Sequence, residues 1–424
     1  MAEGSFFQLF LTAVSKIDLI PIAFDDEGFK DVYLSFWHGF DGKSGELPSF
    51  AVADGSSSST TFRGGVRVAY VRAMANIYDG ASLVGSLYDV DVRAGHRLRR
   101  VSLYMRALEF RCLRKALESC STAVMAMCDG DLYPSLHPVV VRLTDQEVEA
   151  YVEYLRALYE LYKFAAERKI LLVGITKDSF INYLGARILA SQVSKENGEL
   201  GRELSRIRSI RNIERRLSSL VGKVEGVEVY LREARRLSIS SDEEVFDEYA
   251  VKPGFTTPLV LAPQPVYLSE EIKAGTRCWA DSKIRGRLIE AGPPLSDVAG
   301  ALDGLYSLPP VVLSYWRPWH GVGVYRLDVG GWSFGLDVKW GSVEGDFFLP
   351  EEALARLEGV VAVLNSLSPE PFTVKPLLDT DALVRFKAET YKECYEPLLV
   401  EALRKAGLKA LPTKRDLRRL VVGV

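Results

Sequence analysis

The sequence predicts an α/β fold with a mixed β-sheet flanked by helices. Short apolar runs bounded by turn residues, which are typical of buried strands, alternate with longer segments of helical periodicity. Strand-like segments come first and are followed by a helix, a strand, a second helix and another strand. Two of the apolar runs, 50–56 and 124–131, share one design, because each contains an Asp-Gly pair after its apolar residues. This order of elements indicates a sheet core covered by helices.

The composition is that of an ordinary globular protein. The chain has 424 residues, of which 48% are hydrophobic and 26% charged, enough for two or three domain-sized units. The formal net charge is −3, so any basic surface for nucleic acid must be local. The five cysteines include no C-x-x-C pair, which favours a reducing cytoplasm over a disulfide or zinc framework. No apolar run is long enough to cross a bilayer, so we expect no membrane association.

The first elements read as strands. The run 50–56 is apolar up to Asp54 and Gly55, where we expect the backbone to turn. Residues 66–78 and 82–92 are rich in β-branched and aromatic residues, and Asp79-Gly80 between them predicts a hairpin. Apolar residues then recur at helical spacing over 96–121. The sequence thus predicts three consecutive, antiparallel strands followed by a helix.

The later elements complete this core. A buried strand over 124–131 carries Asp129, a helix covers 144–168, and a second buried strand over 169–176 ends in the polar group Lys177-Asp178-Ser179. Three strands, helix, strand, helix and strand is the order of a ribonuclease-H-like core. We therefore predict that fold class.

Three carboxylates occupy corresponding places in this order: Asp54 on the first strand, Glu109 on the first helix and Asp129 on the fourth strand. Carboxylate oxygens are preferred by hard cations such as Mg²⁺ and Mn²⁺. In the ribonuclease-H-like fold, acidic residues at these places hold two ions that act on a phosphodiester. The alternatives are that both Asp-Gly pairs are ordinary turns and that Glu109 is a solvated glutamate at the helix edge.

The sequence resembles the NurA nucleases, best known from archaea, which work with the hexameric HerA ATPase on DNA ends. The resemblance rests on the order and spacing of short motifs rather than on any one of them. The motifs are Ala53-Asp54-Gly55-Ser56, Arg106-Ala107-Leu108-Glu109-Phe110-Arg111, Asp129-Gly130-Asp131-Leu132, Ile175-Thr176-Lys177-Asp178-Ser179, Ser241-Asp242 with Gly254-Phe255-Thr256-Thr257-Pro258, and Leu377-Leu378-Asp379-Thr380-Asp381-Ala382-Leu383. Three departures from the family pattern are Asp131 in place of Ser, Thr380-Asp381 in place of Ala-His, and Phe372 or Thr373 where a Tyr is expected.

The resemblance implies a metal-dependent DNA nuclease. Asp381 aligns with the last metal ligand, so that Asp54, Glu109, Asp129 and Asp381 would hold two Mn²⁺ or Mg²⁺ ions, and Lys177 would neutralise charge developing on the phosphate. It further implies single-stranded endonuclease and 5′-to-3′ exonuclease activity in double-strand-break end resection during DNA repair. A homodimer and a HerA-type hexameric translocase partner are implied as well.

We expect four segments: an N-terminal segment 1–46, a nuclease core 47–192, a helical insertion 193–240, and a β-rich C-terminal part 241–424. The insertion is amphipathic from 200 to 224 and is predicted to double back near 222–226. Its polar face would contact DNA phosphates, form a dimer element, or be a solvated face with Glu-Arg pairs. The cations on that face are Arg202, Arg206, Arg208, Arg211, Arg215 and Arg216.

The C-terminal part is predicted to form a meander over 310–315, 323–329 and 332–338. Aromatic residues with arginines there favour base stacking on single-stranded DNA. The predicted DNA-binding residues are Trp316, Arg317, Trp319, His320 and Arg326. The alternatives are buried strand-end aromatics and a hydrogen-bonded structural histidine. Residues 6–14 read as a packed helix, and 414–420 as a basic amphipathic tail.

Two other classes of function stay open. An actin-like or sugar-kinase-like ATPase also uses an Asp-Gly turn at such a strand end, but needs a more Gly-rich second phosphate loop than Asp129-Gly130-Asp131 provides. A non-catalytic adaptor of a ring ATPase would keep the fold without the activity, and the departure at the expected Tyr leaves room for it.

Overall fold

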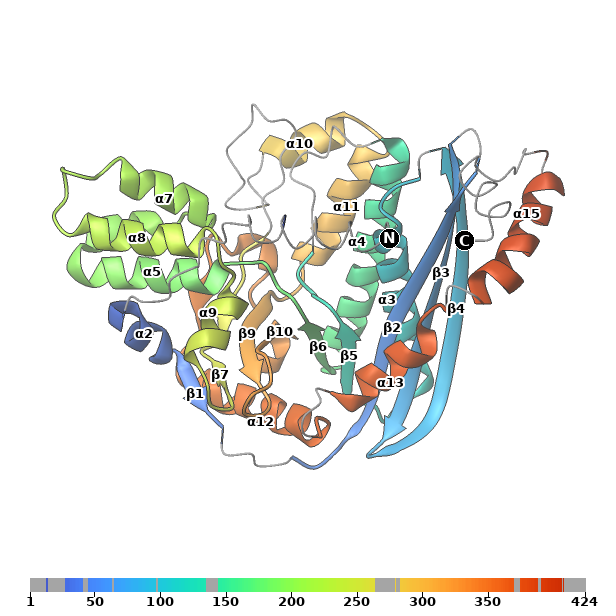
Figure 1. Ribbon diagram of the computed structural model, residues 1–424, viewed down its shortest axis with the longest axis horizontal. Coiled ribbons are helices and arrows are strands. Elements are labelled where there is room, and N and C mark those ends of the chain that lie inside the picture. Colours follow the sequence, from blue (N-terminus) through green and yellow to red (C-terminus); the bar gives the residue numbers. More distant parts are fainter. Residues whose placement is uncertain are drawn as a thin grey trace.

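The computed structural model describes residues 13, 27–40, 45–62, 65–96, 98–134, 144–263, 279, 283–369, 374–387, 390–405 and 407 (Figure 1). The strands are β1 (Trp37–Gly39), β2 (Ser49–Thr61), β3 (Val66–Asp79), β4 (Ser82–His96), β5 (Met125–Asp129), β6 (Leu171–Thr176), β7 (Gly254–Thr256), β8 (Leu259–Val260), β9 (Val311–Arg317), β10 (Tyr325–Gly330) and β11 (Phe347–Phe348).

The helices surround this sheet. They are α2 (Glu27–Leu34), α3 (Val101–Ser119), α4 (Asp145–Glu167), α5 (Tyr183–Glu196), α6 (Gly198–Leu204), α7 (Ile210–Ser218), α8 (Val227–Leu237), α9 (Asp242–Tyr249), α10 (Lys283–Glu290), α11 (Leu295–Tyr306), α12 (Glu352–Ser366), α13 (Lys375–Val384) and α15 (Glu396–Lys405). Short 3₁₀ turns cover Gly331–Phe334 and Trp340–Ser342, and a π-helical turn covers Tyr391–Tyr395.

The strands form one mixed sheet in the order β1-β7-β9-β10-β6-β5-β2-β3-β4, with β8 paired to β9 and β11 paired to β8. β2, β3 and β4 pair antiparallel, and Gly80 at the β3–β4 turn has a positive φ of 58°. β5 then pairs parallel to β2, and β6 parallel to β5. The predicted mixed α/β sheet and its order of elements are therefore confirmed, whereas the ribonuclease-H-like classification stays a prediction.

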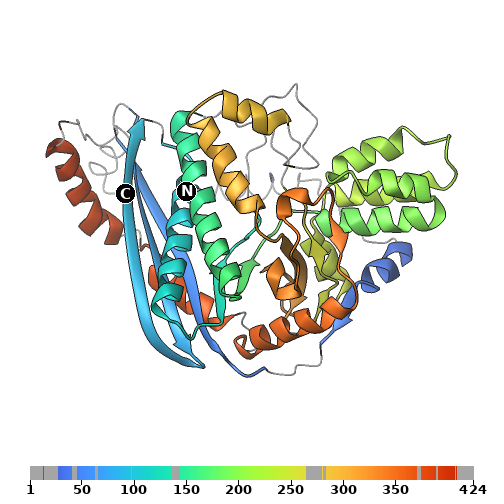
Figure 2. The same ribbon diagram turned by 180° about the vertical axis from the view of Figure 1, so that it is seen from behind.

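The two faces of the sheet bury different residues because successive side chains on a strand point in opposite directions. On one face, Ala51 and Ala53 of β2 and Cys128 of β5 belong to the core that includes α3 and α4. On the other face, Phe50 and Val52 belong to the core that includes α12 and Leu377 of α13. Viewed from behind, α3 lies against the long β2–β4 strands, and α4 packs on α3 (Figure 2).

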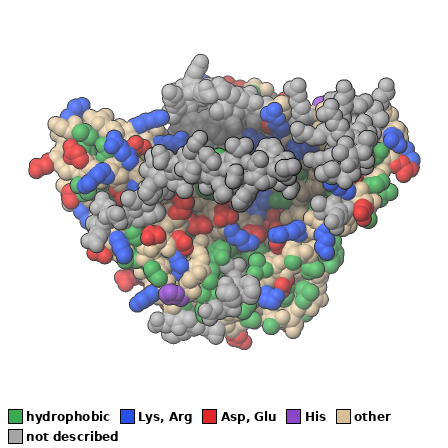
Figure 3. Space-filling model, in the orientation of Figure 1, with side chains coloured by type: hydrophobic (Ala, Val, Ile, Leu, Met, Phe, Trp, Pro, Cys, Tyr) green, Lys and Arg blue, Asp and Glu red, His purple; other side chains and the backbone are tan. Residues whose placement is uncertain are grey.

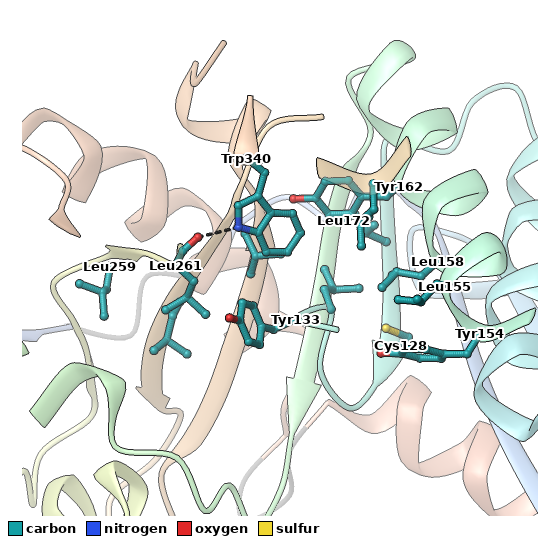
Figure 4. Packing of buried hydrophobic residues seen from close by; sticks show 14 of the residues in the cluster. Cys128, Tyr133, Tyr154, Leu155, Leu158, Tyr162, Leu172, Leu259, Leu261 and Trp340 are labelled. Atoms are coloured by element: carbon teal, nitrogen blue, oxygen red, sulfur yellow. Dashed lines mark hydrogen bonds between the residues drawn. The ribbon is translucent and has the colours of Figure 1, made fainter. Parts of the chain in front are cut away.

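The core cluster that contains α4 extends to β8, β9 and Trp340. Leu155 and Leu158 of α4 face Leu172 of β6, while Trp340 stands over Tyr133 and donates its indole N–H to the Leu261 carbonyl at 2.7 Å (Figure 4). The start of α4 is fixed by a capping box, in which Thr144 and Glu147 bond each other's backbone N–H groups. These contacts pack α4 and the Trp340 turn against the sheet beside β6.

The insertion differs in detail from its prediction. The expected helix from 200 to 224 is divided into α6 and α7, and the chain then turns through Gly222 and Gly226, both at positive φ, into α8. α7 packs on α8, and both pack on α5, so this part is a compact helical group at one end of the molecule (Figure 1). The predicted doubling back near 222–226 is confirmed; the four segment boundaries stay predictions.

Three local predictions are wrong. β2 does not turn at Gly55 but continues to Thr61, because this part of the strand pairs with β3 along its whole length. The expected strand 332–338 is instead a 3₁₀ turn that ends at Gly335 with a φ of 74°. The first helix begins at Val101 rather than at 96, since β4 extends to His96.

Some predicted features lie outside the described residues. These are the helix at 6–14, apart from Ala13, the basic tail at 414–420, and both Phe372 and Thr373. Within the part of the chain that the structure describes, no helix combines the length and apolar character needed to cross a membrane.

Gly174 in β6 supports a prediction about packing. A Cβ at this position would lie 2.5 Å from the Gly130 carbonyl oxygen, in the turn after β5. We expect Gly174→Ala to destabilise the protein by about 1–3 kcal/mol, because backbone must move to relieve the overlap. Urea unfolding measures this effect. Gly359→Ala, on the exposed face of α12 with no atom near the added Cβ, is the matched control and should stabilise by roughly 0.5–1 kcal/mol. Equal stability of Gly174→Ala and wild type would contradict the close approach.

Candidate active site

Strand register brings two carboxylates and a lysine together where β5 and β6 end beside the middle of β2. Along β2 the side chains of Phe50 and Val52 lie on the α12 face, and Asp54 follows them at the same spacing of two. β5 and β2 pair in parallel with Ala53 opposite Cys128, so Asp54 and Asp129 are neighbours across the strands. Lys177 follows β6 and places its Nζ 2.7 Å from Asp129 Oδ2.

Glu109 reaches the same place from α3. Its side chain is 1% exposed, so the alternative of a solvated edge glutamate is wrong. α3 can approach β2 this closely because residue 55 is a glycine: a Cβ there would lie 2.9 Å from Met105 Cγ. Gly55 therefore serves helix packing, and its backbone N–H also donates to Asp54 Oδ1 at 2.7 Å.

Arg106 holds Glu109 in place and is the main functional residue that sequence reasoning did not assign. Its Nη1 donates to both Glu109 oxygens, at 2.8 and 3.0 Å, and to the Asp129 carbonyl. Its Nη2 donates to the Asp131 carbonyl at 2.8 Å. The spacing of three residues between Arg106 and Glu109 on a helix was the available signal for this pair.

α13 carries Asp381 and is anchored on the long hairpin. Arg72 of β3 donates to the carbonyls of Val384 and Arg385 at 2.6 and 2.7 Å, satisfying the end of the helix. Thr380 is buried and accepts a hydrogen bond from Asn76 at 2.9 Å. Asp381 is itself paired with Arg385 at 2.5 Å, and its charge acts on both Asp54 and Lys177.

The acidic groups repel one another in a poorly solvated place. Burial, with repulsion from Asp129 and Asp381, raises the pKa of Asp54 to about 6. Burial likewise raises the pKa of Glu109 to about 8; Arg106 opposes this rise, while Asp54 and Asp129 add to it. Burial lowers the pKa of Lys177, but Asp129 outweighs it and leaves the net shift upward. Lys177 is therefore a charged partner of Asp129.

The donors fit a hard divalent cation in kind. Carboxylates whose pKa values rise through mutual repulsion gain from a cation placed among them. Among the described residues, however, no three His, Cys, Asp or Glu side chains stand close enough together to hold one ion. Both Glu109 oxygens are directed to Arg106, and one Asp129 oxygen to Lys177. For Glu109 to bind an ion, its carboxylate would therefore have to turn away from Arg106.

Buried carboxylates outside the site fix the loops that leave β5 and β6. Asp328 of β10 accepts hydrogen bonds from the backbone N–H groups of Leu132 and Tyr133, both at 3.0 Å. Asp242, which the resemblance had singled out, is fully buried and accepts the N–H groups of Leu184 and Gly185 at the start of α5. Asp242 therefore anchors a helix and is not part of the acidic group.

Most of the predicted DNA-binding residues are engaged in the protein interior. Trp316 is 0% exposed and donates to Asn365, Arg317 is buried against Asp247, and Arg326 is buried against Asp328. Their predicted contact with DNA is wrong, because β9 and β10 are covered on both faces. Trp319 is half-buried and donates to the Ser368 carbonyl at 2.6 Å, while His320 is exposed. DNA contact by these two stays a prediction.

The predicted basic face of the insertion is divided in the same way. Arg208 is largely buried, paired with Asp346 at 3.1 Å and stacked over Tyr183, whereas Arg216 pairs with Glu203 at 2.7 Å. Arg211 and Arg215 line an open surface pocket with Glu214. On the face shown in Figure 3, acidic side chains gather near the middle, with Lys and Arg side chains around them.

Carboxylates gathered beside the ends of β5 and β6 in a mixed α/β sheet are an arrangement that metal-dependent nucleases use. The NurA domain family model matches residues 48–279, more than half of the chain. This chain therefore belongs to the NurA family.

Comparison with solved structures gives two further likenesses. The NurA nuclease from Sulfolobus solfataricus is 15% identical, with 90% of this chain and 92% of that chain covered and a TM-score of 0.49. A NurA structure bound to dAMP and manganese is 13% identical, with 96% and 98% covered and a TM-score of 0.41. No curated protein sequence matches the chain.

The raised pKa of Asp54 predicts how stability depends on pH. Because the pKa of about 6 lies above the usual value of 3.8, the folded protein binds this proton more tightly than the unfolded chain. The contribution of Asp54 to stability is therefore lost as pH rises from about 4 to about 6. We expect Asp54→Asn to stabilise the metal-free protein at pH 8 by up to about 3 kcal/mol, and much less at pH 5.

Urea unfolding in EDTA at both pH values measures this difference. Asp379→Asn, on the exposed side of α13, is the matched control, and it should change stability equally little at both pH values. Mn²⁺ should stabilise the wild type but not Asp54→Asn, and so remove the advantage of the variant. An Asp54→Asn protein that is less stable than wild type at pH 8 in EDTA would show that burial and repulsion do not disfavour the charged carboxylate at this residue.

Proposed function

We propose that this protein is a metal-dependent DNA nuclease that hydrolyses phosphodiester bonds. The single observation that carries the proposal is the convergence of Asp54, Asp129 and Glu109 beside Lys177, in a chain of the NurA family. The substrate is single-stranded DNA, cut internally and from 5′ ends, in the resection of double-strand breaks. These finer points rest on the family resemblance.

The proposed roles follow the position of each residue. Asp54, Glu109, Asp129 and Asp381 would hold two Mn²⁺ or Mg²⁺ ions, which when bound supply an acidified attacking water and stabilise the leaving 3′-oxygen. Lys177 stands beside Asp129 and neutralises charge on the scissile phosphate. Arg106 orients Glu109 and the backbone on both sides of Gly130. α13 closes the site with Asp381.

The proposed assembly is a homodimer that works with a hexameric HerA-type ATPase. The edge strand β4 supports the dimer, because its outward side chains are apolar and exposed: Leu83, Val84, Tyr88, Val90 and Val92 are 45–72% exposed. β4 is also the last strand of the sheet among the described residues. A long apolar edge strand can pair with another chain. A second copy of this chain is the proposed partner of that edge.

Cleavage of end-labelled single-stranded DNA tests the nuclease and its ligands together. We expect activity with Mn²⁺ or Mg²⁺ and none with EDTA. Asp54→Ala, Asp129→Ala and Asp381→Ala should each lower the rate by at least about 100-fold, because each removes an ion-binding carboxylate. Asp379→Ala, two residues from Asp381 on the same helix, is the matched control and should keep full activity.

Either of two results would contradict the proposal. Cleavage that survives in Asp129→Ala purified in the same way as wild type would place the reaction elsewhere. Absence of cleavage in the wild type, with a HerA-type ATPase added, would favour the non-catalytic adaptor.

The dimer is tested by molar mass in solution. We expect wild type to have twice the chain mass of 47.2 kDa by light scattering, and Val90→Lys to have the mass of one chain, because the lysine charge would be buried in the pairing surface. Val251→Lys replaces an equally exposed valine in the loop after α9 and should leave the mass unchanged. A Val90→Lys protein that stays dimeric would move the interface away from β4.

A further inference from the structure

Phe180 is the most exposed large apolar side chain of the described residues that lies beside the acidic site. It is 85% exposed, in the loop that joins β6 to α5. It follows Lys177 by three residues, so its Cα lies within roughly 11 Å of the Lys177 Cα at 3.8 Å per residue. Lys177 in turn contacts Asp129 at 2.7 Å. An exposed aromatic ring therefore stands within the reach of a few nucleotides of the carboxylates.

The backbone on both sides of this ring is fixed. Asp178 has a positive φ of 58°, and the Ser179 N–H donates to Glu243 Oε2 at 2.7 Å. On the other side, the Ile181 carbonyl accepts the Asp242 N–H at 2.9 Å. Residues at which the chain is held in the left-handed region and bonded from both sides do not turn inward easily. The loop thus holds the ring in solvent rather than leaving it free to bury itself.

The acidic residues near Phe180 indicate which part of a DNA strand could bind there. Asp178 is exposed, and Glu243 is partly exposed on the neighbouring helix α9. These carboxylates repel phosphate groups, so the part of the loop around Phe180, beyond Lys177, is unsuited to bind the DNA backbone. An uncharged base presents a flat face that stacks on an aromatic ring whatever its sequence, and the bases of single-stranded DNA are free to do so.

We propose that Phe180 is a stacking platform for one base of single-stranded DNA, next to the nucleotide whose phosphodiester lies at Asp54 and Asp129. The proposal rests on the nuclease function proposed above. Phe180 would position the strand without touching the reacting atoms. Its removal therefore weakens substrate binding and raises KM while kcat stays nearly constant.

The test uses the full chain and single-stranded oligonucleotides that carry 2-aminopurine, whose fluorescence is quenched on stacking. Affinity is measured in EDTA, where no cleavage occurs, and KM and kcat are measured in Mn²⁺. We expect Phe180→Ala to weaken affinity and raise KM by about 5- to 100-fold, with kcat changed by less than about twofold. Phe180→Trp should retain wild-type affinity and quenching. Leu398→Ala, at an apolar residue on α15 that is 66% exposed, is the matched control and should change neither.

An abasic scan identifies the stacked base. At one position in the oligonucleotide, loss of the base should weaken binding by wild type as much as Phe180→Ala does, and Phe180→Ala should then add no further loss. The proposal is overturned if Phe180→Ala binds and cleaves like Leu398→Ala, or if its defect is the same at every abasic position. If Phe180→Ala cleaves DNA and binds it with unchanged affinity, the stacking proposal is wrong and the proposed nuclease function still holds. If quenching depends on Phe180 but the protein does not cleave DNA, the proposed nuclease function is wrong and the stacking proposal still holds.

Discussion

The structure depends on holding three carboxylates close together where β5 and β6 end beside β2. Asp54, Glu109 and Asp129 come from three different elements, and burial together with mutual repulsion raises the pKa values of Asp54 and Glu109. Leaving buried carboxylates without partners is costly, so cations must stand beside them. Arg106 and Lys177 fill that requirement from inside the chain. The site is thus a balanced cluster rather than an isolated acidic patch.

The cluster needs contacts between parts of the chain that are far apart in sequence. α13 reaches the strand ends only because β2 and β3 hold it: Ser56 accepts the Phe386 N–H, and Arg72 donates to two carbonyls at the helix end. The Arg72 guanidinium also lies over the Phe386 ring at 4.0 Å. About 300 residues separate these partners. The position of Asp381 is therefore a property of the whole fold and not of its local sequence.

The strands and the convergence of Asp54 with Asp129 follow from the sequence because an alternation of two residues fixes which side chains share a face. Asp381 could be placed only by resemblance, since nothing in its own helix points to the strand ends. The aromatic residues at the end of β9 suggested an accessible surface for base stacking. Trp316, however, lies on the face of the sheet that α12 covers. The hydrogen bonds of Arg106 to the Asp129 and Asp131 carbonyls join residues more than 20 apart, and no local pattern encodes them.

The arrangement of Arg106 would let Glu109 turn to a cation without leaving a buried charge unpaired. If Glu109 turns from Arg106 towards an ion, the guanidinium still has the carbonyls of Asp129 and Asp131 as acceptors. A buried charge is therefore not left without partners, which is the costly outcome. Lys177 is about one-third exposed, so water can replace Asp129 around its ammonium group. Asp328 of β10 also holds the loop after β5 through hydrogen bonds from two of its backbone N–H groups. These hydrogen bonds do not involve the side chains of Glu109 or Asp129, so they would persist if those carboxylates bound an ion.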